Sequence, residues 1–143
     1  MVRTLEQPFW RPVAHVAIAN NYDAHRITEI LQRQGYQVFE HADGVELVGA
    51  LADHIEQRQG RPPDLIVADV RTRGCSGMTV AAGLHELGVT TPVILIAESS
   101  DPIPLRDQLW TVDPEIALTR IPELARRWAP VRLLEPEPVR LQA

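Results

Sequence analysis

The chain has 143 residues, enough for one domain, and 45% of them are apolar, which is typical of a globular rather than a disordered protein. A formal net charge of −5 with scattered arginines disfavours nucleic-acid binding, which requires a clustered basic face. No apolar run approaches the roughly 18 residues of a membrane helix, and residues 1–12 lack the apolar segment of a secretion signal. The single cysteine, Cys75, cannot form an internal disulfide, so we expect a cytoplasmic protein.

Two hydrophobic periodicities alternate along the chain. Short apolar runs predict buried parallel strands, and apolar residues recurring every three or four positions predict helices. The predicted strands are Val16–Ala19, Gln37–Glu40, Leu65–Ala68, Val93–Ala97 and Ile116–Thr119. The predicted helices have apolar faces formed by Ile27, Ile30 and Leu31, by Val48, Leu51, Ala52 and Ile55, and by Val80, Ala81, Leu84 and Leu87, with a short fourth helix at Leu105–Val112.

This order of elements predicts an α/β fold with a five-stranded parallel sheet. We expect a tail at residues 1–12, the domain at 13–129, and a second tail at 130–143, where three prolines prevent a long helix. In such sheets ligands bind outside the carboxyl ends of the strands. The candidate site residues are therefore the polar and small residues at those ends.

The segment from Asp64 to Met78 carries the most specific pattern. Asp69 ends an apolar strand, and Gly77 follows eight positions later. This spacing, in its place after the third strand, resembles the receiver domain of response regulators, and the resemblance covers about Val13–Trp128. It implies the flavodoxin-like, doubly wound (βα)5 three-layer sandwich and a role in phosphorelay signalling. It also implies Asp69 as phospho-acceptor, Mg²⁺ as cofactor, and a sensor histidine kinase or other signalling protein as partner.

The residues around Asp69 depart from the receiver pattern. Receivers hold Mg²⁺ with the acceptor aspartate and an acidic pair after the first strand, and these positions are Asn20 and Asn21 here. Their Ser or Thr after the fourth strand corresponds to Ala97, which has no hydroxyl. Because Mg²⁺ prefers anionic oxygen ligands, we expect it to bind at Asp69 weakly or not at all.

The receiver lysine after the fifth strand is missing too. Its position is Ile121 if Pro122 is the proline that normally follows it, or Arg120 with a slip of one residue. These changes leave the core intact but weaken the charge compensation that phosphoryl transfer requires. We therefore interpret the chain as a divergent receiver, or pseudo-receiver, in which Asp69 is a conditional or vestigial acceptor.

Output is expected through protein–protein contacts. The resemblance places this surface at Leu105, Leu109, Trp110 and Pro122–Trp128. With no output domain after Trp128, we expect a stand-alone receiver, for which a homodimer is possible and neither nucleic acid nor membrane is a partner. No nucleophile elbow, phosphate-binding glycine loop or His/Cys cluster is present, so we do not expect an enzyme.

Two other interpretations stay open. Asp23-Ala24-His25 resembles the Asp-x-His-x-x-Gly signature of cobalamin-binding flavodoxin-like domains, although the glycine position is Thr28. In the receiver register, Asp23 would instead cap the first helix. Residues 103–113 resemble the receiver-like wing domains of bacterial amino-acid decarboxylases, which implies a non-phosphorylated accessory or oligomerisation domain.

Overall fold

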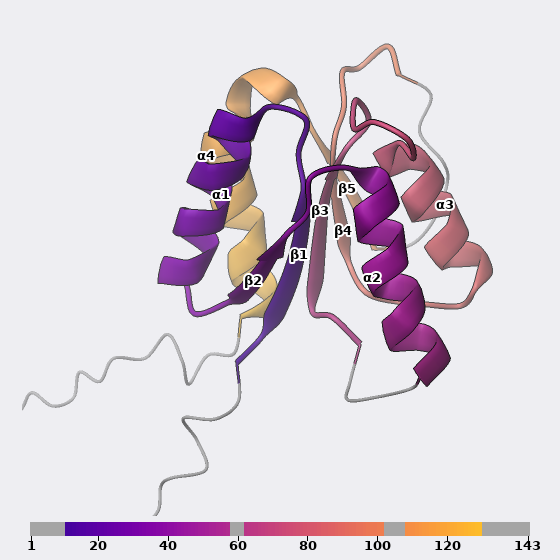
Figure 1. Cartoon of the computed structure of the whole chain (residues 1–143). Helices are drawn as coiled ribbons and strands as arrows, with labels where there is room; N and C mark the ends of the chain where they lie inside the picture. Colours follow the sequence, from indigo (N-terminus) through magenta and orange to yellow (C-terminus); the bar gives the residue numbers. More distant parts are fainter. Residues whose placement is uncertain (1–10, 58–61, 102–107, 130–143) are drawn as a thin grey trace, which may run out of the picture.

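The computed structural model describes residues 11–57, 62–101 and 108–129, which form a three-layer α/β sandwich (Figure 1). A five-stranded parallel sheet, in the order β2-β1-β3-β4-β5, makes the middle layer. The strands are β1 (Val13–Ala17), β2 (Gln37–Glu40), β3 (Leu65–Asp69), β4 (Val93–Ile96) and β5 (Leu109–Val112). Within the described ranges, no helix combines the length and apolar character needed to cross a membrane.

Two helices cover each face of the sheet (Figure 1). Helices α1 (Asn21–Arg33) and α4 (Ala117–Ala125) lie on one face, and α2 (Gly44–Gln57) and α3 (Gly77–Glu86) lie on the other. Two single-turn 3₁₀ helices, η2 (Pro114–Ile116) and η3 (Arg126–Trp128), flank α4. The flavodoxin-like parallel fold predicted from the sequence is therefore confirmed.

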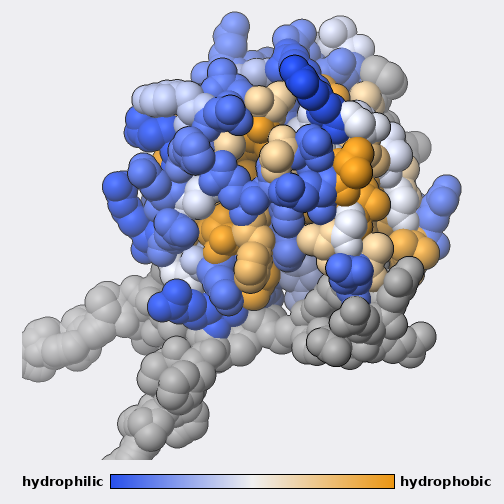
Figure 2. Space-filling model, in the orientation of Figure 1, coloured by the Kyte–Doolittle hydropathy of each residue, from blue (hydrophilic) through white to orange (hydrophobic). Residues whose placement is uncertain are grey.

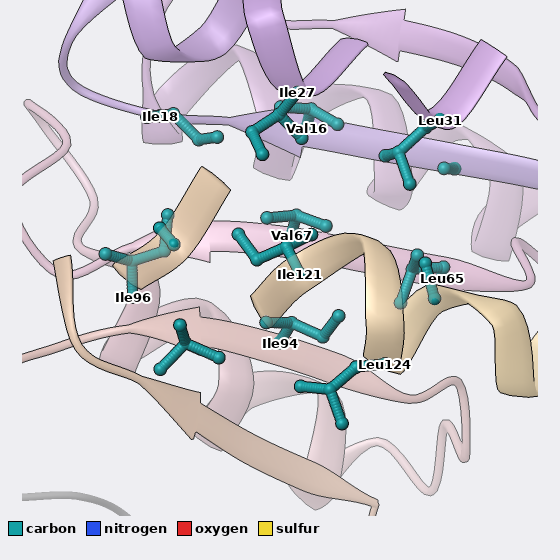
Figure 3. Close-up of a cluster of buried hydrophobic side chains, with 14 of the residues drawn as sticks. Val16, Ile18, Ile27, Leu31, Leu65, Val67, Ile94, Ile96, Ile121 and Leu124 are labelled. Atoms are coloured by element: carbon teal, nitrogen blue, oxygen red, sulfur yellow. The ribbon is translucent and has the colours of Figure 1, made fainter. Parts of the chain in front are cut away.

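The central strand β3 organises the core. All five of its residues are buried, and alternate side chains point into opposite layers, as a pleated strand requires. Val67 packs with Ile94 and Ile121 beneath α1 and α4 (Figure 3), whereas Ile66 and Ala68 pack beneath α2 and α3. Asp69 is the last residue of β3, so it lies at the carboxyl edge of the sheet.

The turn between α1 and β2 holds the carboxyl end of α4. The Gln34 side-chain amide donates to the carbonyl oxygen of Pro122 at 3.0 Å, and the Tyr36 hydroxyl donates to that of Ala125 at 2.6 Å. The last carbonyl groups of a helix have no intrahelical partner, so the side chains of this turn supply hydrogen-bond donors to two of them. Burial, with a smaller contribution from the charge of Asp64, raises the pKa of Tyr36, so its hydroxyl stays a donor.

Two histidines stack against the α2 side of the β2 edge. His15 Nδ1 lies 2.9 Å from His41 Nε2 with the rings parallel, and Phe39 stacks on His15 with a centroid distance of 5.2 Å. His41 Nδ1 lies 3.5 Å from the Glu46 carboxylate. Burial lowers the pKa of His41, and this effect outweighs the opposite influence of Glu46.

The last third of the chain differs from the sequence prediction. The fifth strand is Leu109–Val112, so both the strand predicted at Ile116–Thr119 and the helix predicted through Leu109–Val112 are wrong; residues 105–107 of that helix lie outside the described residues. Asp113 caps the next turn by accepting from the Glu115 N–H at 2.9 Å, and Pro114 begins that turn. An aspartate cap followed by proline is a strong helix start, which is why Ile116–Thr119 leads into α4.

The start of the chain shows smaller differences. The first strand is Val13–Ala17 rather than Val16–Ala19, because Val13 already pairs with Gln37 of β2. The cap of α1 is Asn20, whose side chain accepts from the Asp23 N–H at 3.0 Å. Asp23 therefore lies in the first turn of α1, and its predicted role as N-cap is wrong. The terminal segments 1–10 and 130–143 lie outside the described residues.

Replacing Tyr36 with phenylalanine should lower the free energy of unfolding by about 1–3 kcal/mol, because the buried Ala125 carbonyl would lose its donor. Urea denaturation followed by circular dichroism measures this. Tyr22→Phe is the matched control: Tyr22 is exposed, so its loss of one hydroxyl should cost less than about 0.5 kcal/mol. Equal effects for the two variants would contradict the assigned role of Tyr36.

The lowered pKa of His41 predicts acid sensitivity. In the pH range between this lowered pKa and the ordinary value of about 6.5, the unfolded state binds more protons than the folded state. The His41 contribution to stability is therefore present above pH 6.5 and is lost as the pH falls through the folded-state pKa. Thermal unfolding from pH 7.5 to 5 should show a shallower pH dependence in His41→Gln than in the native chain. His85→Gln is the matched control, because it changes an exposed histidine of α3 and leaves the His41 ring in place.

Candidate functional site

Asp69 lies at the centre of the carboxyl edge of the sheet. It ends β3 and is only 4% exposed. Its two carboxylate oxygens accept hydrogen bonds from backbone groups, Oδ1 from the Arg71 N–H at 2.9 Å and Oδ2 from the Ala19 N–H at 3.3 Å. Backbone donors therefore stabilise this buried carboxylate. A pocket of about 250 Å³ leads to it, and Asn20 and Asp23 are in its lining.

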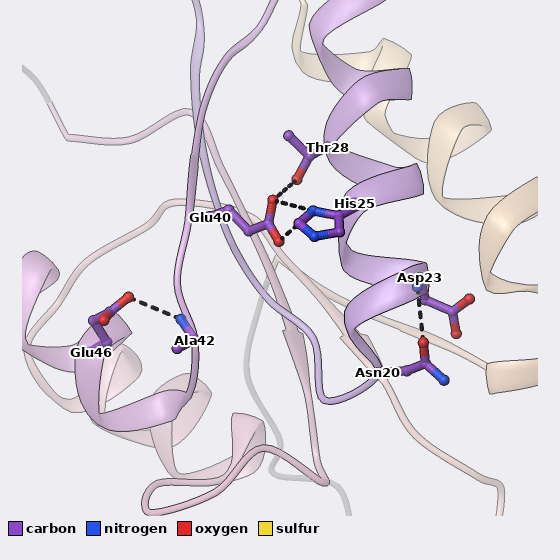
Figure 4. A network of polar contacts seen from close by, with 7 residues as sticks. All are labelled: Asn20, Asp23, His25, Thr28, Glu40, Ala42 and Glu46. Atoms are coloured by element: carbon purple, nitrogen blue, oxygen red, sulfur yellow. Dashed lines mark hydrogen bonds and ion pairs between the residues drawn. The ribbon is translucent and has the colours of Figure 1, made fainter.

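The side chains around Asp69 do not provide the oxygen ligands of a receiver-type Mg²⁺ site. The register pairs Ala17 with Ala68, so the next residue of the first segment, Ile18, comes opposite Asp69 with a buried apolar side chain. The Oδ1 atom of Asn20 caps α1 by accepting from the Asp23 N–H (Figure 4). Asp23 is the one carboxylate besides Asp69 among the described residues that line this pocket. Across the ranges that the structure describes, no three His, Cys, Asp or Glu side chains are grouped so that they could hold a metal ion. Mg²⁺ favours several hard anionic oxygen ligands, and the described lining of this pocket offers only the carboxylates of Asp69 and Asp23.

The predicted hydroxyl position lies at the end of β4. Ala97 follows that strand directly, is buried, and donates its N–H to the Val112 carbonyl at 3.0 Å. Only a methyl group is available there.

Asn21 is exposed and begins α1, and it lines a separate polar pocket that also includes Arg71 and Arg73.

The structure brings neither candidate for the lysine position to this edge. Arg120 and Ile121 lie within α4, where Arg120 pairs with Glu123 at the surface and Ile121 is fully buried (Figure 3). The residue that follows β5 is Asp113, with Pro114 after it. Sequence reasoning missed Asp113 because it assigned the strand too late. The signal was present, since Leu109–Val112 contains the β-branched and aromatic residues typical of a strand, directly before Asp-Pro.

One cation lies beside Asp69. The Arg71 guanidinium is in the lining of the Asp69 pocket, and it forms an ion pair of 2.5 Å with Glu98 in the loop after β4. This pair joins the loops that follow β3 and β4. Both side chains are about half exposed, so the pair contributes little to the stability of the fold.

Two glycines allow the helices to approach the loop after β3. A Cβ atom on Gly77 would lie 3.0 Å from the Asp69 carbonyl oxygen and 2.6 Å from Leu95, so α3 packs closely only with glycine there. A Cβ atom on Gly44, the first residue of α2, would overlap the Cys75 carbonyl oxygen. The Gly44 N–H also donates to the Arg73 carbonyl at 3.2 Å. The spacing between Asp69 and Gly77 therefore has a direct packing cause.

His25 does not lie in a cofactor-binding loop. It is part of α1, its side chain is 70% exposed, and its ring contacts the Glu40 carboxylate at 3.2 Å. Thr28 donates to the same carboxylate at 3.2 Å, so Glu40 joins β2 to α1 (Figure 4). This arrangement accounts for the Asp-Ala-His sequence as part of an ordinary helix surface, and it does not support cobalamin binding.

Comparison with known proteins agrees with the fold. The family model of the response regulator receiver domain matches residues 20–111, more than half of the chain. The protein therefore belongs to the response-regulator receiver family, whose members act in two-component signalling.

Individual relatives are distant. An uncharacterized transcriptional regulatory protein of Bacillus subtilis, YbdJ, is 29% identical over 75 residues, which make up 52% of this chain and 30% of that protein. The match thus spans less than a third of the length of this relative.

Solved receiver structures share the fold. A receiver domain protein of Bacillus halodurans gives a TM-score of 0.69 at 12% identity, covering 85% of this chain and 99% of that one. The receiver domain of a histidine kinase from Syntrophus aciditrophicus gives 0.59 at 24% identity, covering 81% and 90%.

Proposed function

We propose that this receiver domain signals by binding partner proteins in a conformation that does not depend on Mg²⁺-assisted phosphorylation of Asp69. One observation carries the proposal. The Asp69 carboxylate is held by backbone N–H groups, while Ile18, Ala97 and Asp113 occupy the surrounding positions at the ends of β1, β4 and β5. None of these three residues can offset the charge of a phosphoryl group.

The electrostatics of phosphoryl transfer support this proposal. The reaction brings an anionic phosphoryl group to a carboxylate, so it is fast only where cations stabilise the accumulating negative charge. Here Asp23 shares the pocket with Asp69, and Asp113 adds an exposed carboxylate after β5. Arg71 supplies one positive charge, but Glu98 already pairs with it. The local balance therefore opposes phosphorylation.

The proposed output surface comprises Leu109, Trp110 and Pro122–Trp128 and is called the β5–η3 surface here. Its proposed partner is a sensor histidine kinase or another signalling protein. Trp110 of β5 packs edge to face on Trp128 at 4.9 Å, and the Arg127 guanidinium lies 5.9 Å from the Trp110 ring centre. Aromatic and arginine side chains are enriched at interfaces, where they act as anchors. Leu105, also expected on this surface, lies outside the described residues.

Slow phosphorylation of Asp69 is the second candidate. It is favoured by the pocket of about 250 Å³ that reaches the carboxylate and includes Arg71. A small phosphoryl donor could enter it, and the guanidinium could contact the donor if its pair with Glu98 opened. The two candidates differ in one measurable quantity, the extent of acyl phosphate formation.

The first test is intact mass spectrometry after incubation with acetyl phosphate and Mg²⁺. We expect no phosphoryl mass increment on the folded chain, because the site lacks charge compensation for the incoming group. A receiver with the complete acidic pair, hydroxyl and lysine serves as the positive control. An increment that Asp69→Asn abolishes would overturn the proposal and establish Asp69 as an acceptor.

Mg²⁺ binding gives an independent test. Calorimetric titration should show no saturable heat through the low millimolar range, because Asp69 and Asp23 are the two carboxylates of the pocket and apolar Ile18 lies beside them. Asp69→Asn should give the same trace as the native chain. Saturable binding that disappears in Asp69→Asn would mean that this edge still holds the metal.

A further inference from the structure

The outer surface of α2 and α3 exposes apolar side chains away from Asp69. Six large apolar side chains of the described residues are at least 40% exposed, and three of them are on or next to these helices: Val45 at 58%, Val48 at 40% and Leu87 at 67%. Val48 and Leu87 belong to the apolar helix faces predicted from the sequence. Figure 2 shows apolar residues gathered over α2 among hydrophilic ones.

Val48 and Leu87 border a groove between the two helices. The groove has a volume of about 240 Å³, and Leu51 and Leu84 form its buried floor. Its lining is apolar almost throughout: Val48, Leu51, Ala52, Cys75, Thr79, Val80, Gly83, Leu84 and Leu87. Gly83 is one of the lining residues, and a Cβ atom added there would meet no other atom within 4 Å, so the groove has room for a side chain at this position.

The size of the groove favours a protein side chain as its occupant. Pockets for drug-sized ligands measure roughly 300–1,000 Å³, whereas this groove is smaller and runs between two helices. A helix laid against such a groove inserts apolar side chains spaced three or four residues apart. The groove has the dimensions for one or two such anchors.

The charge around the groove defines the partner further. The sequences of α2 and α3 contain no Lys or Arg, and the exposed carboxylates of Asp53 and Glu86 flank the lining residues Ala52 and Leu87. Arg58 follows α2 in the sequence but lies outside the described residues, and Arg73 lies in the loop that precedes α3, two residues from the lining residue Cys75. A second copy placed groove to groove would bring like charges together, which is destabilising. A basic partner would gain attraction from the same carboxylates.

We propose that the α2–α3 groove is a docking site for an amphipathic helix of a partner protein, with apolar anchors flanked by Lys or Arg. The site is separate from Asp69 and from the β5–η3 surface. Docking there needs no phosphoryl group or metal ion, so its test stands independently of the proposed function.

The test uses two synthetic peptides of about 15 residues, the length at which an isolated helix becomes marginally stable. Both carry leucines at positions i, i+3, i+4 and i+7, and the flanking positions are Lys in one peptide and Glu in its twin. We expect the Lys peptide to bind the full chain in a fluorescence anisotropy titration, more weakly at high salt. The Glu twin should bind at least about tenfold more weakly. Amide NMR shifts should cluster on α2 and α3.

Two glycine variants locate the site. Gly83→Leu fills the groove and should weaken binding of the Lys peptide at least about tenfold. Gly49→Leu is the matched control, because a Cβ atom on Gly49 also meets nothing within 4 Å but Gly49 is not among the lining residues. Both replace a helical glycine by a better helix former, so both variants should fold.

Three outcomes would overturn the proposal. These are equal affinity for the Lys and Glu peptides, binding unaffected by Gly83→Leu, and shifts that map away from α2 and α3. Sedimentation velocity tests the alternative occupant, which is a second copy of this chain. A dimer that Gly83→Leu abolishes would assign the groove to a second copy of this chain and would also overturn the proposal.

Discussion

The burial of β3 on both faces of the sheet is the constraint from which the site follows. A strand with five buried residues delivers its last side chain, Asp69, into a region where an unpaired charge is costly. The N–H groups of Ala19 and Arg71 meet this requirement directly from the two neighbouring loops. Because backbone atoms do this, the fold can keep the carboxylate whatever side chains surround it. The divergence at Ile18, Ala97 and Asp113 therefore leaves the architecture intact.

The parts of the fold that the sequence predicts well are those with strong local patterns. Strands β2, β3 and β4 agree with their predicted ranges to within one residue. For β3 and β4 the reason is a continuous apolar run between turn residues, which has few other interpretations. The prediction of the last strand is wrong. The sequence pattern assigns the residues Leu109–Val112 to the end of a short helix, and it assigns the apolar residues at the start of α4 to the strand in their place.

The candidate site shows the same division. Asp69 and Ala97 could be located because each lies at the carboxyl end of a well-predicted strand. The residue after β5 could not, since an error in one strand moved the expected position from Asp113 to Arg120 and Ile121. The proximity of Ile18 to Asp69 depends on the pairing register of β1 and β3, which is a tertiary property with no local signal. Likewise, the spacing of the apolar residues that include Val48 indicates one helix face, and the spacing of those that include Leu87 indicates another. Neither spacing shows whether another element covers the face.

The contact between Gly44 and the loop after β3 has a thermodynamic consequence. The first turn of α2 rests on the Arg73 and Cys75 carbonyls, and Cys75 also lies in the α2–α3 groove. A displacement of the first turn of α2 therefore breaks the Gly44–Arg73 hydrogen bond or carries the loop after β3 with it. If a ligand binds either region more tightly in one arrangement of this contact, binding at the other region changes by the same factor.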